Sequence, residues 1–466
     1  MGGRLRASCA IAALLVTGGL ARPAAAETLT DAFAQAYQYN PQLLAQRAQL
    51  RATDEGVPQA LAGWRPTVQF TGSAGKEIAE TTQSVNGSGP TTAQYLTPRT
   101  LDLNITEPVW TSGRTPALIR QAEHTVLSQR AQTVAIEEQV LFSVAQAYLD
   151  VVRDQATVDL NVNNEQVLRR QLEATNDQFR VGEVTRTDVA QAESSLAAGR
   201  AQLAAAESNY LTSRANFRQV IGVEPPARLA PGSTVDRFFP LTLDASIARS
   251  RTENPTITTA MYNVDVALLQ VKVAEGALYP TLQAVGNVQK NFGASPNSLA
   301  VLESLSGTLA AQLTVPLYQG GAEYSTIRQA KETLGQRRLD LDTARDQVQA
   351  AVVQGWGLNE SAKAQILATQ AQVTSAEVAL NGVREEARVG QRTTLDVLNA
   401  QQTLVNARVA LVTAQHDRVV ASYTVLSTVG SLSPQVLGLR TEVYDAMAHY
   451  QQVRNAWGGV RIPDGR

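Results

Sequence analysis

The sequence is poor in the residues that build metal centres, disulfide frameworks and many active sites. It contains one cysteine and three histidines in 466 residues. The histidines, His124, His416 and His449, stand apart from one another without the spacing of metal ligands. The sequence also lacks a phosphate-binding glycine loop and a nucleophile elbow. We therefore expect a protein that is not an enzyme and needs no cofactor.

Aromatic residues are scarce as well, at 5% of the chain, and alanine carries much of the 44% hydrophobic fraction. Small side chains let helices approach closely, so this composition favours extended helix–helix packing over one large globular core. The formal charge is only −2 and no basic stripe is present. Nucleic acid is therefore excluded as a partner.

Long apolar runs are missing too, since none reaches the roughly 20 residues of a membrane-spanning helix. Residues 1–26 nevertheless have the pattern of a secretory signal. Arg4 and Arg6 precede an apolar run from Cys9 to Val16, and small residues at 24–26 form a cleavage site. The single cysteine falls within this signal. We expect an exported chain without disulfide or lipid anchor, either soluble or inserted in the outer membrane as strands.

The rest of the chain is an internal duplication. Asn40-Pro41 recurs as Asn254-Pro255, and later Ile221-Gly222 recurs as Val429-Gly430. The offset between the copies changes once, before Pro108 and its counterpart, which marks a surface loop that is longer in the first copy. The predicted units are a signal (1–26), a first repeat (27–222), a linker (223–242), a second repeat (243–430) and a C-terminal tail (431–466).

Each repeat has the same predicted order of elements. A first helix, about 30–62 or 243–277, is kinked or restarted by its Asn-Pro pair. Two runs of alternating apolar and polar residues follow, separated by loops such as 83–92 and 291–298. A long helix then begins near Arg114 or Ala322 and ends at a glycine, and a last helix returns to Ile221 or Val429.

Helix lengths indicate a rod. The long helix has roughly 68 residues, or about 100 Å at 1.5 Å per residue. The first and last helices of a repeat together have about the same length, so they could stack end to end beside the long one. Such a rod is too long for a compact domain and predicts a coiled-coil wall or a spacer.

The alternating runs predict four strands per chain, each long enough to cross a bilayer when tilted. About eight strands make the smallest outer-membrane barrel, and an open sheet cannot sit in lipid with unpaired edges. We therefore expect a mainly α protein with a membrane β-barrel, in which several copies pool their strands and project long helices from one end.

Two similar stretches join the long helix of each repeat to its return helix, namely residues 180–191 and 388–399. Each contains Arg-Val-Gly followed by Thr and Asp. The glycine supplies the left-handed residue that ends one helix, and Thr and Asp offer cap oxygens to the next. Each stretch is therefore the predicted tip of an antiparallel helical hairpin.

Taken together, the Asn-Pro helices, the proline-initiated strands, the long helices and the Arg-Val-Gly tips resemble the TolC-like outer-membrane export channels over essentially the whole mature chain. The resemblance implies a homotrimer with a twelve-stranded barrel and an α-barrel tunnel through the periplasm of a Gram-negative bacterium. It implies a passive conduit that meets a periplasmic adaptor and an inner-membrane transporter.

The cargo stays open between protein and drugs. The tail, with Leu437-Gly438-Leu439 and His449-Tyr450, resembles the subgroup associated with type I secretion. A different class of function, a periplasmic coiled-coil scaffold or adaptor outside the membrane, is the alternative.

The resemblance also implies a periplasmic gate. Asp396 matches an acidic pore position, and Asn399 stands where some relatives carry a second acid. Asp188 and Gln191 repeat this acid-then-amide pattern in the first repeat. For each acid the alternative is a solvated residue of a helix N-terminus.

Arg392 matches a residue that holds the entrance closed in the family. The family's aromatic partner is replaced by Ala387, so Asp188 or Glu183 is a candidate acceptor, and an ordinary surface role is the alternative. The implied adaptor-docking residues, beside their plain capping role, are Arg180, Val181, Gly182, Arg388, Val389 and Gly390.

Overall fold

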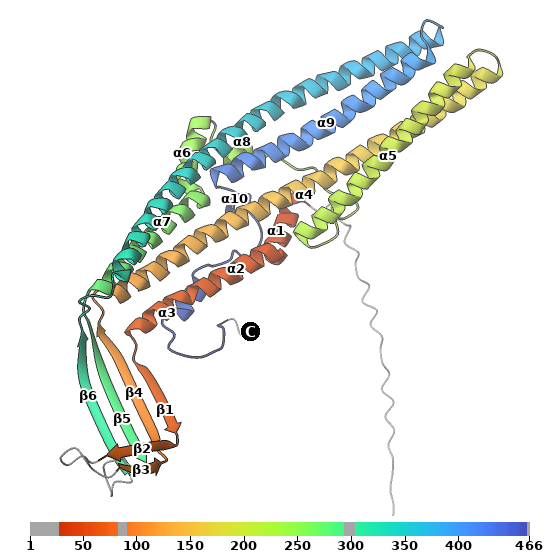
Figure 1. Cartoon of the computed structure of the whole chain (residues 1–466). Helices are drawn as coiled ribbons and strands as arrows, with labels where there is room; N and C mark the ends of the chain where they lie inside the picture. Colours follow the sequence, from red (N-terminus) through yellow and green to blue (C-terminus); the bar gives the residue numbers. More distant parts are fainter. Residues whose placement is uncertain (1–27, 83–90, 293–302, 464–466) are drawn as a thin grey trace, which may run out of the picture.

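The computed structural model describes residues 28–82, 91–292 and 303–463. The expected signal, 1–26, lies outside these residues, as do 83–90 and 293–298 of the two expected loops. Long helices extend from a sheet at one end of the molecule to two hairpin tips at the other (Figure 1). Among the described helices, none is both long and apolar enough to cross a membrane.

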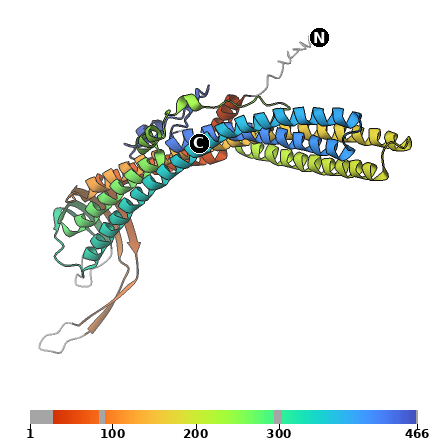
Figure 2. The same cartoon turned by 90° about the horizontal axis from the view of Figure 1, so that it is seen from above.

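The longest elements are α4 (Arg114–Arg180) and α8 (Ala322–Arg388), with 67 residues each. Their return helices are α5 (Arg186–Ile221) and α9 (Thr394–Val429), with 36 residues each. The two hairpins run side by side with both tips at the same end (Figure 2). The predicted starts, ends and lengths of these helices are confirmed.

The first helix of each repeat is restarted at its Asn-Pro pair. In the first repeat the elements are α1 (Leu29–Tyr39), α2 (Pro41–Asp54), α3 (Gly56–Leu61) and the 3₁₀ turn η1 (Ala62–Trp64). In the second they are α6 (Leu243–Glu253), α7 (Pro255–Glu275) and η3 (Gly276–Leu278). Asn40 and Asn254 are extended, with ψ of 122°, because the residue before proline avoids the helical region.

These asparagines join helices end to end. Asn40 Oδ1 accepts the backbone N–H of Gln42 at 2.9 Å and caps α2, while its Nδ2 donates to the Val220 carbonyl of α5 at 2.8 Å. Asn254 does the same between α7 and the Thr428 carbonyl of α9. Helix α2 therefore continues the line of α5, and α7 continues the line of α9. The comparison of helix lengths in the sequence predicts this end-to-end arrangement.

The sheet end consists of four antiparallel strands in the order β1-β4-β5-β6. They are β1 (Thr67–Ala74), β4 (Arg99–Trp110), β5 (Thr281–Phe292) and β6 (Glu303–Thr314). In the register, Leu103 lies opposite Phe70 and Val288, whereas Asn104 lies opposite Gln69 and Asn287. One face is therefore apolar and the other polar, which confirms the four alternating strands.

A second sheet was not predicted. Strands β2 (Glu77–Thr82) and β3 (Thr91–Leu96) pair with each other, so Thr91 and Thr92 are strand residues rather than loop. Ile78 is 64% exposed and Tyr95 80% exposed. An alternating pattern identifies a strand when one of its faces is buried. In this hairpin both of these apolar side chains are exposed, so the pattern did not reveal it.

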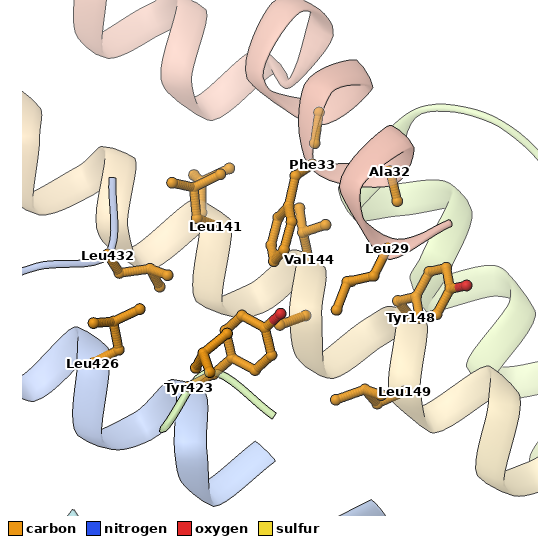
Figure 3. Close-up of a cluster of buried hydrophobic side chains, with 14 of the residues drawn as sticks. Leu29, Ala32, Phe33, Leu141, Val144, Tyr148, Leu149, Tyr423, Leu426 and Leu432 are labelled. Carbon is orange, nitrogen blue, oxygen red and sulfur yellow. The ribbon is translucent and has the colours of Figure 1, made fainter. Parts of the chain in front are cut away.

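The main core lies midway along the rod, where α1, α4 and α9 meet. Phe33, Leu141, Tyr148 and Leu426 are buried there, and Leu432 of the tail joins them (Figure 3). The segment expected as a linker contributes to the same core. It contains η2 (Asp236–Phe238), and its Val235 and Phe239 are buried in the cluster.

The tail packs on the middle of the rod. Its helices are α10 (Pro434–Leu437) and α11 (Ala448–Val453). His449 of α11 contacts the buried carboxylate of Asp54 on α2 at 3.1 Å. Helix α7 buries Ala267 and Val271, whereas Leu268 between them is 39% exposed.

Candidate functional site at the hairpin tips

Both tips are built by the same backbone geometry. Gly182 has φ of +81° and Gly390 has φ of +78°, the left-handed conformation that glycine adopts at lowest cost. The next residue closes the turn, since the N–H of Glu183 donates to the Gln178 carbonyl and that of Gln391 to the Glu386 carbonyl, each at 2.9 Å. These are the bonds of a Schellman motif, so the predicted role of the glycines as helix-ending residues is confirmed.

The return helices begin with complete capping boxes. Thr185 caps α5 and Thr393 caps α9, and the third residue of each helix, Asp188 or Asp396, accepts hydrogen bonds from its cap. Asp396 Oδ2 accepts the Thr393 backbone N–H at 3.0 Å and its hydroxyl at 2.9 Å. The capping role that stood as the alternative for these acids is therefore present.

Capping also keeps the acids charged. The backbone N–H and the hydroxyl of Thr393 hold the pKa of Asp396 below its ordinary value, with a smaller contribution from the charge of Arg392. The Thr185 hydroxyl and N–H lower the pKa of Asp188 in the same way. Both carboxylates are thus available as fixed negative charges at neutral pH while they cap a helix.

A second row of polar side chains lies one turn beyond these acids. Asn399 follows Asp396 by three residues and Gln191 follows Asp188 by three, so each pair shares a helix face. Asn399 is exposed, and its side chain has no hydrogen-bond partner in the described part of the chain. The acid-then-amide pattern therefore forms a continuous polar strip on each return helix.

The outermost residues are the same in both tips and are open to solvent. Val181 is 71% exposed and Val389 is 72% exposed. The preceding arginines are held by acids of their own helix: Arg180 by Asp177 at 3.2 Å and Arg388 by Glu385 at 2.9 Å. Each tip therefore presents an exposed valine beside an oriented guanidinium, a pattern suited to contact with another protein.

Arg392 pairs within its own hairpin. Its Nε contacts Glu386 Oε2 at 2.8 Å, across the turn from the end of α8. The candidate acceptors Asp188 and Glu183 make no ion pair with it in the described structure. The link therefore braces the second tip and does not join it to the first.

Contacts between the two hairpins begin one turn below the tip. Leu398 of α9 is buried against Leu168 of α4 and Ala192 and Leu196 of α5. Further along α9, Gln401 Nε2 donates to Asn164 Oδ1 of α4 at 3.5 Å. Its Oε1 accepts a hydrogen bond from Arg384 Nη2 of α8 at 2.9 Å. An apolar contact and a long hydrogen bond therefore hold these hairpins together near the tip.

Sequence reasoning missed Glu386, Leu398 and Gln401. The duplication contained a signal for the first of them. The first-repeat counterparts of Glu386 and Arg392 are Gln178 and Val184, so both members of the ion pair differ between the repeats together. The first tip therefore lacks both members of the pair, and the acid and the base of the second tip were the signal for it.

The histidines each lie beside a carboxylate and not beside each other. His124 contacts Asp265 at 3.2 Å, His416 contacts Asp150 at 3.0 Å, and His449 contacts Asp54. Within the described residues, no group of three or more His, Cys, Asp or Glu side chains is placed to hold a metal ion.

Known proteins with this sequence pattern are membrane channels and secretion proteins. The sequence matches the family described as outer membrane efflux protein over residues 32–223 and 247–431. Outer membrane efflux protein BepC of Brucella suis is 35% identical over 98% of this chain and 97% of its own length. Alkaline protease secretion protein AprF of Pseudomonas aeruginosa is 25% identical over 61% of this chain and 60% of its own.

The fold has close counterparts among solved structures. The Campylobacter jejuni CmeC outer membrane channel superposes with a TM-score of 0.76, at 17% identity, and the match covers 92% of this chain and 90% of that chain. At this identity the likeness concerns the fold, with its long helical hairpins and four antiparallel strands.

Proposed function

The chain belongs to the outer membrane efflux protein family, and we propose that three copies of it form a single export conduit across the outer membrane and the periplasm. Membership of this family makes the chain an outer-membrane channel of a tripartite efflux or secretion system and not an enzyme. It also decides against a periplasmic scaffold outside the membrane. The number of copies, the gate, the docking residues and the cargo are the proposed part.

The open edges of the sheet are the observation that carries the pooling of strands between copies. The edge strands β1 and β6 each pair on one side only, and their apolar side chains are bare. Phe70 is 67% exposed, Leu305 73% and Leu309 87%. Unpaired edges are not tolerated in lipid, so β6 of one copy pairs with β1 of the next. Three copies give a closed barrel of twelve strands, within the range known for outer membranes.

The helical hairpins continue this barrel into the periplasm. The tips lie at the opposite end of the rod from the sheet, about 100 Å of helix away, so they form the periplasmic mouth. The exposed Val181 and Val389, beside Arg180 and Arg388, receive the tips of a periplasmic adaptor, and the left-handed Gly182 and Gly390 leave room for a close approach. The adaptor couples the mouth to an inner-membrane transporter that supplies the energy.

The gate lies on the polar strips just inside the mouth. Asp396 and Asp188, kept ionised by their threonine caps, form rings of carboxylates that attract cations and repel anions. Asn399 and Gln191 extend the strips without charge. Arg392, braced by Glu386, holds the second tip in its bent form, so opening the mouth separates the hairpins at Leu398 and Gln401.

Small molecules are the first proposed cargo. The relative at 35% identity is described as an efflux protein and matches nearly the full length of both chains. Secretion of a protein is the second candidate, because AprF, a protease secretion protein, is also similar. Deleting the gene separates the two. Hypersensitivity to drugs with an unchanged set of secreted proteins supports efflux, and loss of a secreted protein without hypersensitivity supports secretion.

Disulfide crosslinking tests the trimer. The only cysteine of the sequence falls in the expected signal, so introduced pairs report cleanly. Ser73→Cys on β1 is combined with Ser304→Cys or Ser306→Cys on β6, and each single variant serves as the control. Oxidation in outer-membrane fractions should give crosslinked species up to three chains in a double variant alone. A chain that stays monomeric in both double variants contradicts the proposal.

A further inference from the structure

The four membrane strands contain few charges, and their positions are unequal. The charged residues of these strands are Arg99, Asp102, Glu107, Lys290 and Glu303. Because side chains alternate between the faces of a strand, position and register assign each charge to one face. Arg99, Glu107, Lys290 and Glu303 share the parity of the apolar residues, and they stand near strand ends.

Asp102 alone has the parity of the polar face. It lies opposite Thr71 of β1 and Gln289 of β5, in a row that continues to Ser306 of β6. The adjacent row consists of Gln69, Asn104, Asn287 and Thr308. In the four described strands, Asp102 is thus the one ionisable group on a face otherwise made of hydroxyls, carboxamides and small apolar residues.

The carboxylate of Asp102 is held in place by its neighbours. Asn287 of β5 donates its side-chain N–H to Asp102 Oδ2 at 2.7 Å. Two residues along β4, the side-chain oxygen Oδ1 of Asn104 is buried and accepts no hydrogen bond. Because this oxygen is closed to solvent, the carboxylate of Asp102 is the group that can meet ions on this face. Carboxylate oxygens are among the ligands that hard cations prefer.

We propose that Asp102 forms a second cation-attracting ring inside the sheet end of the conduit, where its carboxylate attracts hydrated cations and divalent ones most strongly. The proposal rests on the proposed trimer, which turns the polar face inward and brings three copies of Asp102 into one lumen. The other side chains of this face are neutral, so the hydrogen bond from Asn287 is what offsets the negative charge of Asp102 in the described strands. Three carboxylates around a water-filled lumen raise the local concentration of cations and lower that of anions.

Ion selectivity of the purified trimer in planar bilayers tests this ring. Under a KCl gradient, Asp102→Asn should lower the ratio of cation to anion permeability roughly two- to fivefold. The variant should still assemble, as judged by the change in its gel mobility on heating. Mg²⁺ added on the sheet side should reduce the current of the native channel more than that of Asp102→Asn. Glu107→Gln is the matched control, since it removes an acid from the same strand on the opposite face, and it should leave both quantities unchanged.

The outcomes separate this inference from the function on which it rests. A conducting trimer in which Asp102→Asn keeps the native permeability ratio overturns the second ring and leaves the conduit intact. An equal change in Glu107→Gln also overturns it, because the effect then depends on strand charge and not on the polar face. A native protein that forms no conducting trimer overturns the proposed function, and the ring with it.

Discussion

The side-chain N–H of Asn254 donates to the backbone carbonyl of Thr428 at 3.0 Å, so one asparagine begins α7 and secures the end of α9. This carbonyl belongs to the last turn of a helix, where no later backbone N–H reaches it. The same arrangement joins Asn40 to Val220 in the first repeat. In each repeat, the end-to-end junction of two helices therefore depends on the amide oxygen and the amide N–H of one asparagine.

Replacing Asn254 by Asp should separate these two tasks. Asp keeps the oxygen that caps α7 but loses the donor, and it places a carboxylate against the Thr428 carbonyl. We expect a loss of about 1–3 kcal/mol in the free energy of unfolding, because a buried acceptor is left without a partner. The measurement is the thermal unfolding of the detergent-solubilised protein, followed by circular dichroism. Asn381→Asp, at an exposed side chain of α8, is the control, and equal stability of the two variants would contradict the double role of Asn254.

Gly430 and Gly222 occupy equivalent positions with unequal surroundings. Both are left-handed, at φ of +87° and +95°. A Cβ on Gly430 would stand 2.6 Å from Asn254 Cα, whereas a Cβ on Gly222 meets nothing within 4 Å. Gly222→Ala should cost about 1 kcal/mol for the backbone conformation alone, and Gly430→Ala about 3 kcal/mol because backbone must also move. Thermal unfolding of the two variant proteins compares them directly, and equal losses would show that the close approach at Asn254 relaxes freely.

The sequence predicts the parts of this fold that local signals define. Glycines and prolines mark the ends of α4, α5, α8 and α9, and the duplication tests each boundary twice. The hairpin β2–β3 was missed because it has no single buried face. The buried Val235 and Phe239 were missed because the segment between the repeats follows no helical or strand period. At the site, capping was predicted from residue order, whereas the Arg392–Glu386 pair depends on how the turn folds back in space.

Glu138 predicts a pH dependence of stability. It is 5% exposed on α4, and burial together with the nearby Glu137 raises its pKa to about 9 even though the Leu432 N–H donates to it. In the unfolded chain its pKa is about 4.3. The folded form therefore keeps a proton that the unfolded form releases, so stability present below about pH 4.3 is lost progressively as the pH rises to about 9.

Glu138→Gln should remove this dependence, since an amide keeps the shape and the acceptor without a charge. We expect the variant to be more stable than the native protein at pH 8, by up to about 5 kcal/mol from these two pKa values, and similar at pH 4.5. Thermal unfolding followed by circular dichroism at both pH values measures the difference. Glu332→Gln, at an exposed glutamate, should follow the native profile, and parallel profiles for all three proteins would contradict a protonated Glu138.

The ion pair of Arg392 with Glu386 predicts coupled effects on the mouth. Both side chains are about half exposed, so the pair should contribute less than about 1 kcal/mol to stability. If it braces the bent tip, Arg392→Gln and Glu386→Gln should each raise the conductance of the proposed trimer, and the double variant should raise it no further than either one. Single-channel recording tests this. Arg388→Gln, which breaks the equivalent pair with Glu385 outside the turn, should leave conductance unchanged, and additive effects in the double variant would contradict the brace.

Asn399→Asp should strengthen the proposed entrance ring. The new carboxylate stands one helical turn beyond Asp396 on the same face, and it disturbs neither the Thr393 capping box nor any side-chain partner of Asn399 in the described chain. In the proposed trimer the substitution doubles the charge of the ring, so a divalent cation added on the tip side should block the current at a concentration roughly tenfold lower. Asp396→Asn should weaken the block instead. Because the Thr393 donors lower the pKa of Asp396, the native block should persist as the pH falls and fade only below about pH 4. If both substitutions leave the block unchanged, this strip of α9 does not face the conduit.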